Sequence, residues 1–253
     1  MVEALDPGQE AGSAIKYDDI ARSIRGDEVG RAPYEVLWSR RGRHVTALIR
    51  PNGLQSHYFV KRVGDSRVIG PLSLSGELAA QEILFGTYSE SFVARRTPEL
   101  LHATPDVLFF TGLRDHKSLS RLLHARRLRK GDVTQAAHIA ASLHSLPACA
   151  GATGAPILTC PVILYDEITP DDVGNTLGLN EAFLRLVGIS PELQSCLRRA
   201  REMWTPTRTI HGDFQLDNLI RPRDGEELSV VDWELFGVGD PAWDLGAFVG
   251  GLY

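Results

Sequence analysis

Apolar and polar residues alternate along three short runs near the start of the chain, a period-2 pattern typical of half-buried strands. The runs are YEVLWSR at 34–40, RHVTALIR at 43–50 and HYFVKR at 57–62, and the turn-forming segments SRRGR and PNGLQS separate them. We therefore predict three consecutive antiparallel strands. The polar, weakly patterned residues 1–30 before them indicate a loose lead-in.

The period changes to a helical one after the third predicted strand. Residues 76–88, GELAAQEILFGTY, predict one amphipathic helix. The positions at near-helical spacing are Leu78, Ala79, Glu82, Leu84 and Phe85. Two further short strands are expected in ELLHATP at 99–105 and DVLFFTG at 106–112, after which the apolar run breaks into the polar RDHKS.

The rest of the sequence has mainly helical periodicity. Residues 116–129 and 132–146 both have helical periodicity, and helices with loops are expected up to about residue 204. The second helix carries one apolar face, formed by Ala136, Ile139, Ala140, Leu143 and Leu146. A loop, a strand, a DG turn and a second strand follow. The pattern thus predicts an α+β chain with a β-rich N-terminal lobe, residues 1–112, and a mostly helical lobe, residues 113–253.

Composition narrows the class of protein. A chain of 253 residues with 43% apolar composition can bury a substantial core, and a net charge of −5 argues against nucleic acid or an anionic membrane as its main partner. The start MVEALDPGQE has no signal pattern, and no stretch approaches the roughly 18 apolar residues of a membrane span. We therefore expect a cytoplasmic protein. Cys149, Cys160 and Cys196 are not spaced as metal ligands and are expected to be buried or inert, so zinc is not expected.

The candidate chemistry lies in HGDFQLDN at 211–218 and VVDWE at 230–234. A His-Gly-Asp triplet alone is usually an ordinary turn. Here Asn218 follows Asp213 by five residues, and Asp232 returns 14 residues later across the predicted hairpin. Phosphoryl transfer uses one carboxylate beside the acceptor hydroxyl and oxygen ligands that hold Mg²⁺ against the nucleotide phosphates. These three residues fit those requirements.

Together with GDPAWDLG at 239–246, these segments resemble the aminoglycoside phosphotransferase and choline kinase family, relatives of the protein kinases. The family motif is HGDxxxxN, then a strand ending in IDWE or VDWE, then GDPxxDLA. The resemblance is strong over residues 207–249, with LHSLP at 143–147 and YFVKR at 58–62 as secondary matches. It implies a bilobal, protein-kinase-like fold with a small β-rich N-lobe, a larger helical C-lobe and the nucleotide between them.

The resemblance also implies a role for each site residue. Asp213 is then the catalytic base that accepts the proton of the acceptor hydroxyl, and Asn218 and Asp232 coordinate Mg²⁺. His211 is expected to brace the loop. Asp240 and Asp244 are expected to fix loops and helix starts by hydrogen bonding and not to bind metal.

Lys61 lies between apolar residues of the third predicted strand, where a lysine is ordinarily exposed. By resemblance it reaches the α- and β-phosphates and is held by an acidic residue of the following helix. We select Glu82, because it sits on an apolar-flanked turn of that helix. Glu77 stays open as the alternative, and ordinary surface charge is the competing reading for both.

Other features of the sequence do not change the expected chemistry. GVGDPA at 237–242 formally matches a dinucleotide fingerprint, but no βαβ unit frames it and Asp240 would repel a phosphate. No GxSxG elbow and no Walker A sequence occur. The basic run RLLHARRLRK at 121–130 reads as a solvated helix face, with contact to an acidic partner as the alternative.

Two departures from the family pattern affect the expected activity. The turn SRRGR, which should cover the phosphates, contains only Gly42, so arginine side chains or backbone amides are candidates to replace the usual contacts. The sequence also stops nine residues after Asp244, where family members continue through helices that help to build the acceptor pocket. A short natural chain, a truncation, and a partner protein that completes the site all stay open.

The expected reaction is Mg²⁺-dependent transfer of the γ-phosphoryl group of ATP or GTP to a hydroxyl of a small molecule or of a peptide Ser or Thr. The rival from another class is a pseudokinase-like binding module that serves as a scaffold for a partner protein. The presence of Asp213, Asn218 and Asp232 together argues against the scaffold, because binding alone makes no chemical demand for all three.

Overall fold

A computed structural model describes most of the chain in eight stretches: residues 34–41, 44–51, 57–63, 74–104, 107–113, 116–147, 190–223 and 227–253. The predictions for the N-terminal lead-in and for the cysteines at 149 and 160 lie outside these described residues. Cys196 lies within them and is exposed, not buried. No helix in these stretches combines the length and apolar character needed to cross a lipid bilayer.

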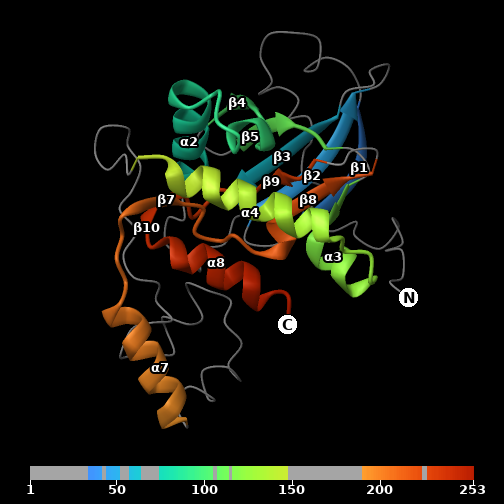
Figure 1. The fold of residues 1–253 in the computed structure, drawn as a ribbon. Helices are drawn as coiled ribbons and strands as arrows, with labels where there is room; N and C mark the ends of the chain where they lie inside the picture. Colours follow the sequence, from blue (N-terminus) through green and yellow to red (C-terminus); the bar gives the residue numbers. More distant parts are fainter. Residues whose placement is uncertain are drawn as a thin grey trace.

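The alternating runs form one antiparallel sheet, as predicted. Its strands are β1 (Tyr34–Arg41), β2 (His44–Pro51), β3 (Tyr58–Val63), β4 (Leu100–Ala103) and β5 (Val107–Thr111), in the order β1-β2-β3-β5-β4. Consecutive strands pair along the blue side of the sheet, and β5 then inserts between β3 and β4 (Figure 1). The β-rich N-terminal part is therefore closed by a strand pair that comes after the helix.

Strand alternation gives this sheet two different faces. One face carries an apolar cluster formed by Ala47, Ile49, Val60, Val107 and Phe109. The opposite face presents Leu108 and Phe110, which pack with Leu74 ahead of the first helix. On that second face, Thr46 of β2 stands opposite Lys61 of β3. The sheet therefore offers polar side chains on the face turned toward the rest of the molecule.

The predicted helix after β3 is present as α2 (Ser75–Gln81), which continues as the π-helix η1 (Glu82–Thr87). The predicted inner face is offset by one position, because Leu78 and Glu82 are exposed. The buried positions are instead Gly76, Glu77, Ala80, Gln81, Ile83 and Leu84. The reason lies at the first turn, where a Cβ on Gly76 would come 2.2 Å from the carbonyl oxygen of Glu234. The backbone of a distant segment thus fixes the rotation of the helix.

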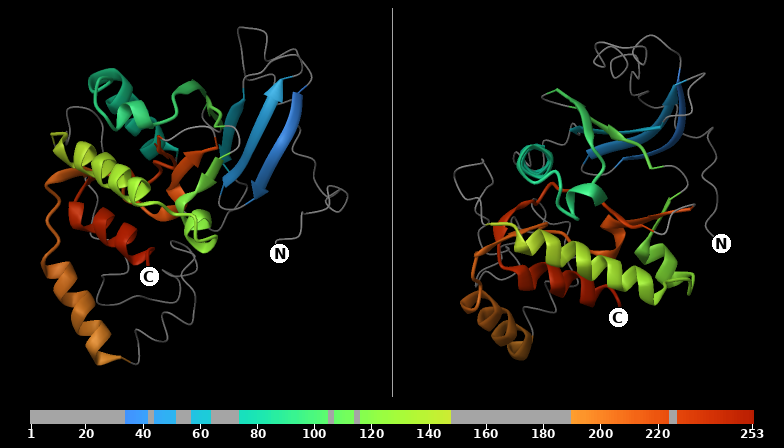
Figure 2. Two further views of the ribbon diagram at one scale, coloured as in Figure 1. Left: turned by 45° about the vertical axis from the view of Figure 1, so that its right-hand side comes forward. Right: turned by 45° about the horizontal axis from the view of Figure 1, so that its top comes forward.

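The C-terminal part is mostly helical. Its helices are α3 (Leu119–His124), α4 (Lys130–Ser145), α7 (Pro191–Glu202) and α8 (Pro241–Gly250). In the N-terminal part, a short 3₁₀-helix, η2 (Ala94–Arg96), precedes β4. All five predicted inner positions of the α4 segment are buried. Figures 1 and 2 show α4 and α8 side by side, away from the five-stranded sheet.

The prediction of a helix from residue 116 is wrong at its start. Residues His116–Ser118 form the strand β6, which pairs with β8 (Leu219–Pro222), and the helix begins only at Leu119, capped by the Ser118 hydroxyl. The basic run is also not one helix face, because α3 ends at His124 and Arg126 has a φ of 55°. The pairing partner of β6 is about a hundred residues away, so local periodicity does not reveal it.

The segment with the candidate chemistry forms two small sheets. β7 (Arg208–Ile210) pairs with β10 (Gly237–Gly239), and β8 pairs with β9 (Ser229–Val230) in the predicted hairpin. A turn of 3₁₀-helix, η4 (Leu216–Asn218), leads into β8. Buried side chains from these elements, including Phe214, Trp233 and Phe236, join the apolar faces of η1, α4 and α8 in one large core. The loops that carry the candidate residues therefore rest on this large core.

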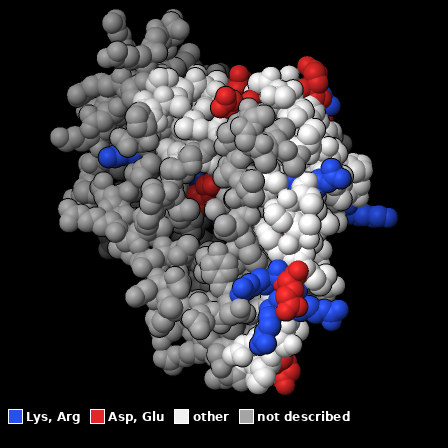
Figure 3. Space-filling model, turned by 90° about the vertical axis from the view of Figure 1, so that its left-hand side faces the viewer, with Lys and Arg blue, Asp and Glu red and all other residues white. Residues whose placement is uncertain are grey.

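Helix α7 carries charge of both signs. Its exposed charged residues are Glu192, Arg198, Arg199, Arg201 and Glu202. Figure 3 shows basic and acidic side chains intermingled at the lower end of this face, where α7 lies. Such a mixture does not form the single-sign field that steers a polyanion or a polycation.

A buried ion pair fastens α4 to β8. The Asp132 carboxylate, in a residue only 3% exposed, accepts from the Arg221 guanidinium at 2.6 Å and from the backbone N–H of Arg129 at 2.8 Å. Both charges are shielded from water, so each is stabilised by its oppositely charged partner.

We expect Asp132→Ala to lower the free energy of unfolding by about 3–5 kcal/mol, because it leaves the Arg221 guanidinium buried without a counter-ion. Denaturant unfolding monitored by circular dichroism measures the change. The double replacement Asp132→Leu with Arg221→Met removes both charges and should recover most of the stability. As a control, Glu227→Ala removes an exposed partner of Arg96 and should change little. A double variant as unstable as Asp132→Ala would contradict the interpretation.

Candidate active site

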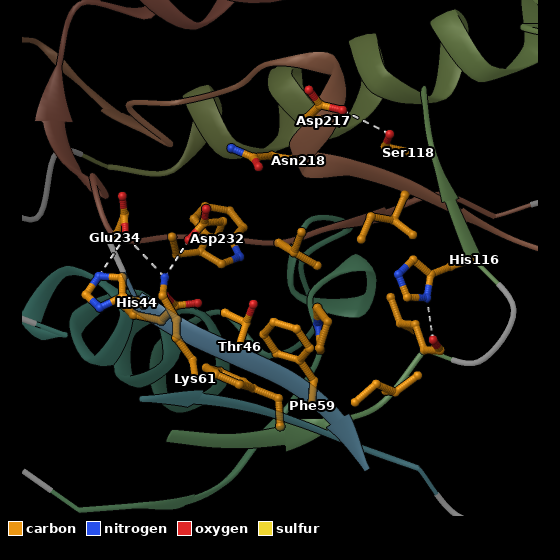
Figure 4. A pocket seen from close by; sticks show the side chains of 18 of the residues that line it. His44, Thr46, Phe59, Lys61, His116, Ser118, Asp217, Asn218, Asp232 and Glu234 are labelled. Carbon is orange, nitrogen blue, oxygen red and sulfur yellow. Dashed lines mark hydrogen bonds and ion pairs between the residues drawn. The ribbon is translucent and has the colours of Figure 1, made fainter. Parts of the chain in front are cut away.

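A cavity of about 690 Å³ lies between the polar face of β2 and β3 and the β8–β9 hairpin. Its volume falls within the range typical of ligand pockets, roughly 300–1,000 Å³. The apolar lining includes Leu48, Phe59 and Phe110 from the sheet and Ile220 and Val231 from the hairpin. Figure 4 shows charged side chains at one end of this cavity and His116 at the other. An extended ligand with one apolar end and one charged end would match this lining.

Lys61 occupies the charged end, where β-strand alternation turns it away from the apolar cluster. It is 3% exposed, and its ammonium lies 2.6 Å from Glu77 Oε2, 2.5 Å from Asp232 Oδ1 and 3.3 Å from Glu234 Oε2. The carboxylates come from α2 and from the segment after β9. One ammonium therefore joins three segments that are remote in sequence (Figure 4).

The predicted pairing of Lys61 with Glu82 is wrong, and the alternative, Glu77, takes that place. Glu82 is exposed, whereas Glu77 is buried at the first turn of α2. Five residues at about 100° each place the two side chains roughly 140° apart around the helix, so only one of them can face Lys61. The close approach of Gly76 to the Glu234 backbone selects Glu77.

The charges in this cluster shift one another's pKa values. Burial by itself lowers the pKa of Lys61, but the carboxylates of Glu77, Asp232 and Glu234 outweigh burial, and the pKa of Lys61 is raised. Burial raises the pKa of Glu77, and the charges of Asp232 and Glu234 add to this rise, against the opposing effect of Lys61. The ammonium therefore stays charged, and three carboxylates compete for it.

Asp213 and Asn218 face each other across the loop that begins after β7. The Asn218 amide nitrogen donates to Asp213 Oδ2 and to the Asp213 backbone oxygen, both at 2.8 Å, and Gln215 donates to Asp213 Oδ2 at 3.0 Å. Burial raises the pKa of Asp213, although nearby His211 and the hydrogen bond from Asn218 act in the opposite direction. A carboxylate with a raised pKa is a better proton acceptor than an ordinary aspartate. Asp213 lies beside the cavity lining and not within it.

Asn218 and Asp232 both line the cavity and come together through the hairpin. The Val231 N–H donates to the Asn218 backbone oxygen at 3.0 Å, which sets Asn218 next to the residue that precedes Asp232. Asp232 has a φ of 67°, a left-handed conformation that is rare for a residue with a side chain and often found at functional sites. The fold thus holds this carboxylate in an unusual backbone geometry.

The oxygens of these two residues fit a hard cation. Because the Asn218 amide nitrogen is engaged by Asp213, its Oδ1 is the atom left for a metal, and Asp232 keeps Oδ2 beyond its contact with Lys61. Mg²⁺ is commonly bound by one or two such protein oxygens together with substrate phosphates. Across the described stretches, no group of three or more His, Cys, Asp or Glu side chains is arranged to hold a metal ion by itself. The donor set therefore suits a metal that arrives with phosphates.

Buried hydrogen bonds to Asp244 hold the loop that carries Asp213. The fully buried Asp244 carboxylate accepts from the backbone N–H groups of His211 and Gly212 at 2.9 Å each, and it contacts His144 Nε2 of α4 at 2.9 Å. Gly212 has a φ of 83°, and a Cβ there would lie 2.2 Å from the Leu235 carbonyl oxygen. The triplet around Gly212 is therefore a constrained turn.

The expected structural roles of His211, Asp240 and Asp244 are confirmed. His211 is fully buried; its Nδ1 accepts from the Asp213 N–H, so its Nε2 donates to the Val231 carbonyl at 3.0 Å. Asp240 caps α8 by accepting from the Ala242 N–H. GVGDPA forms β10 and the start of α8, and β10 pairs antiparallel with β7, whereas the dinucleotide fingerprint requires a parallel βαβ unit.

Two residues at the charged end of the cavity, Glu234 and His44, had no role predicted from the sequence. Glu234 lies in the VVDWE segment, and its contact with Lys61 was not predicted. His44 opens β2, and its Nε2 lies 3.2 Å from Glu234 Oε2. His44 lies two residues before Thr46, so strand alternation puts both side chains on the same face of β2. Only the register between β2 and β3 shows that this face lies beside Lys61.

A family profile and several curated proteins match parts of this chain. The profile of the phosphotransferase enzyme family matches residues 100–250. A 40-residue stretch is 55% identical to acyl-CoA dehydrogenase family member 10 of Mus musculus and 48% identical to acyl-CoA dehydrogenase family member 11 of Homo sapiens. That stretch is 15% of this chain but only 4% and 5% of those proteins, so the chain spans a small part of their length.

Similar solved structures establish the fold. The gentamicin–APH(2″)-IIa complex matches with a TM-score of 0.53 and 18% identity over 90% of this chain and 72% of that chain. An ethanolamine kinase of Plasmodium vivax gives 0.53 and 14% over 88% and 61%, and a microcompartment-associated aminopropanol kinase gives 0.52 and 16% over 92% and 73%. The predicted bilobal, protein-kinase-like α+β fold is confirmed.

We expect Asp244→Asn to loosen the turn that carries Asp213. Asparagine has one acceptor oxygen, so one of the donors now shared by the carboxylate is left unpaired, at a cost of about 1–3 kcal/mol. The backbone amides of His211 and Gly212 should then exchange with deuterium roughly 5- to 150-fold faster, as measured by NMR. The matched control Asp240→Asn, at the N-cap of α8, should leave both amides unchanged. Equal protection in wild type and Asp244→Asn would contradict this assignment.

Proposed function

The chain belongs to the phosphotransferase enzyme family, and from that premise we propose that it transfers the γ-phosphoryl group of ATP or GTP, with Mg²⁺, to a hydroxyl group of an acceptor. The observation that carries the proposal is the convergence of Lys61, Asn218 and Asp232 on one end of a single cavity. Asp213 lies directly beside them, tied to Asn218. This combination gives each residue a role in phosphoryl transfer.

The nucleotide side uses the buried ammonium and the two oxygen ligands. In this proposal Lys61 meets the phosphates, Glu77 holds Lys61 in place, and Asn218 and Asp232 hold the metal. Bound Mg²⁺ supplies positive charge that neutralises the phosphates and fixes their position. The apolar end of the cavity, with Phe59 and Phe110, then receives the purine base.

The acceptor side is built around Asp213. Hydrogen bonds from Asn218 and Gln215 orient its carboxylate next to the proposed metal ligands, and burial raises its pKa. As the acceptor oxygen forms its bond to the γ-phosphorus, the bond from that phosphorus to the β–γ bridging oxygen breaks and the nucleoside diphosphate leaves, while the hydroxyl proton passes to the Asp213 carboxylate. Oriented general-base catalysis of this kind contributes about 10²- to 10⁴-fold in rate.

For the acceptor we propose a small molecule with a hydroxyl group. The support is that similar structures are named as a gentamicin complex, an ethanolamine kinase and an aminopropanol kinase, each name containing a small molecule with a hydroxyl group. A peptide Ser or Thr is the other acceptor to be tested, because exposed basic residues at Arg126, Arg127 and Arg129 lie near α3. An activity assay with small alcohols and with peptides as acceptors distinguishes the two classes.

We expect Asp213→Asn to lower kcat by about 10²- to 10⁴-fold while the affinity for Mg²⁺–ATP changes little. The measurement is Mg²⁺-dependent consumption of ATP and GTP over a panel of amino alcohols, sugars, aminoglycosides and peptides, with calorimetry for binding. Asp217→Asn, four residues along the same loop and facing Ser118, is the matched control and should lose far less. Nucleotide binding without turnover by the wild type for any acceptor would favour the scaffold.

The two candidate partners of Lys61 give a second test. We expect Glu77→Gln to raise the KM for ATP by about 10-fold or more, because Lys61 loses a buried charged hydrogen bond worth roughly 1.5–3 kcal/mol. Glu82→Gln is the same change on the same helix at an exposed position, and it should leave the KM unchanged. A larger effect of Glu82→Gln would refute the pairing seen in the structure.

A further inference from the structure

His44 shares the polar face of the sheet with Lys61. The register pairs Thr46 with Lys61, and His44 lies two residues before Thr46, so both β2 side chains point to the same side as Lys61. Residues His44, Thr46 and Leu48 all line the cavity, at alternate positions of one strand. His44 stands at the end of β2 nearest to the turn that covers phosphates in the protein-kinase fold.

One nitrogen of the His44 ring contacts a carboxylate, whereas the other has no partner in the described part of the chain. The residue is 9% exposed, and its Nε2 lies 3.2 Å from Glu234 Oε2. Its Nδ1 is buried and has no hydrogen-bond partner among the residues that the structure describes. A buried ring nitrogen without a partner is uncommon, and a ligand is one way to satisfy it. Figure 4 shows the ring beside Glu234 and Lys61 at the charged end of the cavity.

The charge balance at this end calls for a second cation. One ammonium, Lys61, faces the three carboxylates of Glu77, Asp232 and Glu234. A nucleotide brings several more negative charges to the same place. The sequence also lacks the run of glycines whose backbone N–H groups would ordinarily cover the phosphates, since the turn before His44 is SRRGR.

We propose that His44 is a phosphate-binding residue of the nucleotide site, with Nδ1 donating to an oxygen of the terminal phosphates while Nε2 donates to Glu234. The inference rests on the proposed function. With both nitrogens acting as donors, the ring bridges a carboxylate and a phosphate as a cation. His44 thereby supplies from a side chain the contact that a glycine-rich turn supplies from its backbone.

Two conservative replacements distinguish phosphate binding by His44 from a role in which His44 only holds Glu234 in place. The amide nitrogen of asparagine falls near the position of Nδ1, and that of glutamine near the position of Nε2. We therefore expect His44→Asn to keep most of the affinity for Mg²⁺–ATP and His44→Gln to lose roughly 10- to 100-fold, as for a charge-assisted hydrogen bond. If His44 only braces Glu234, the order of the two variants is reversed.

The dependence on phosphate number gives the second readout. Calorimetric titration with Mg²⁺–ATP and with adenosine should show that His44→Gln weakens ATP binding but leaves adenosine binding within about 2-fold of wild type, since adenosine has no charge for the ring to meet. His116→Ala, a change in the other histidine of the lining, should weaken both ligands alike. Equal ATP affinity in wild type and His44→Gln overturns the role of His44 alone. Failure of the wild type to bind either ligand overturns the proposed function and this inference with it.

Discussion

The contact of the Lys61 ammonium with three carboxylates is the interaction on which the arrangement of the site depends. It joins β3, the first turn of α2 and the segment after β9, which are separated by up to 173 residues. A buried ammonium requires counter-charges, so these segments cannot drift apart without leaving an unpaired charge in a dry environment. The same contact places Asp232 at the cavity, in a backbone conformation that a free chain would avoid.

The second constraint lies below the loop that carries Asp213. Asp244, from the start of α8, holds two consecutive backbone N–H groups of that loop and is itself held by His144 of α4. The loop is thereby attached to the large core and not to solvent-exposed structure. A base on a rigid support keeps its orientation during turnover, which is what catalysis by positioning requires.

The balance of charge at one end of the cavity affects what can bind there. Carboxylates outnumber the ammonium at the charged end, so an anionic nucleotide is attracted only when further positive charge comes with it. Mg²⁺ supplies part of this charge in the proposed reaction, and His44 supplies part of it in the inference drawn here. In the proposed reaction, nucleotide binding is thus coupled to metal binding by the composition of the site.

The sequence by itself determined the features that depend on local pattern: the strands of the sheet, the inner face of α4 and the hairpin that brings Asp213, Asn218 and Asp232 together within 20 residues. Tertiary structure alone decided the choice of Glu77 over Glu82, the strand at β6, the contact between Asp132 and Arg221, and the place of His44. Each of these depends on a partner that is distant in the chain. Periodicity indicates the buried side of a helix without fixing its exact rotation, and that rotation decides between Glu77 and Glu82, which lie roughly 140° apart around the helix. The physical reason is that local propensity fixes an element's type, whereas its rotation and neighbours are fixed by close packing.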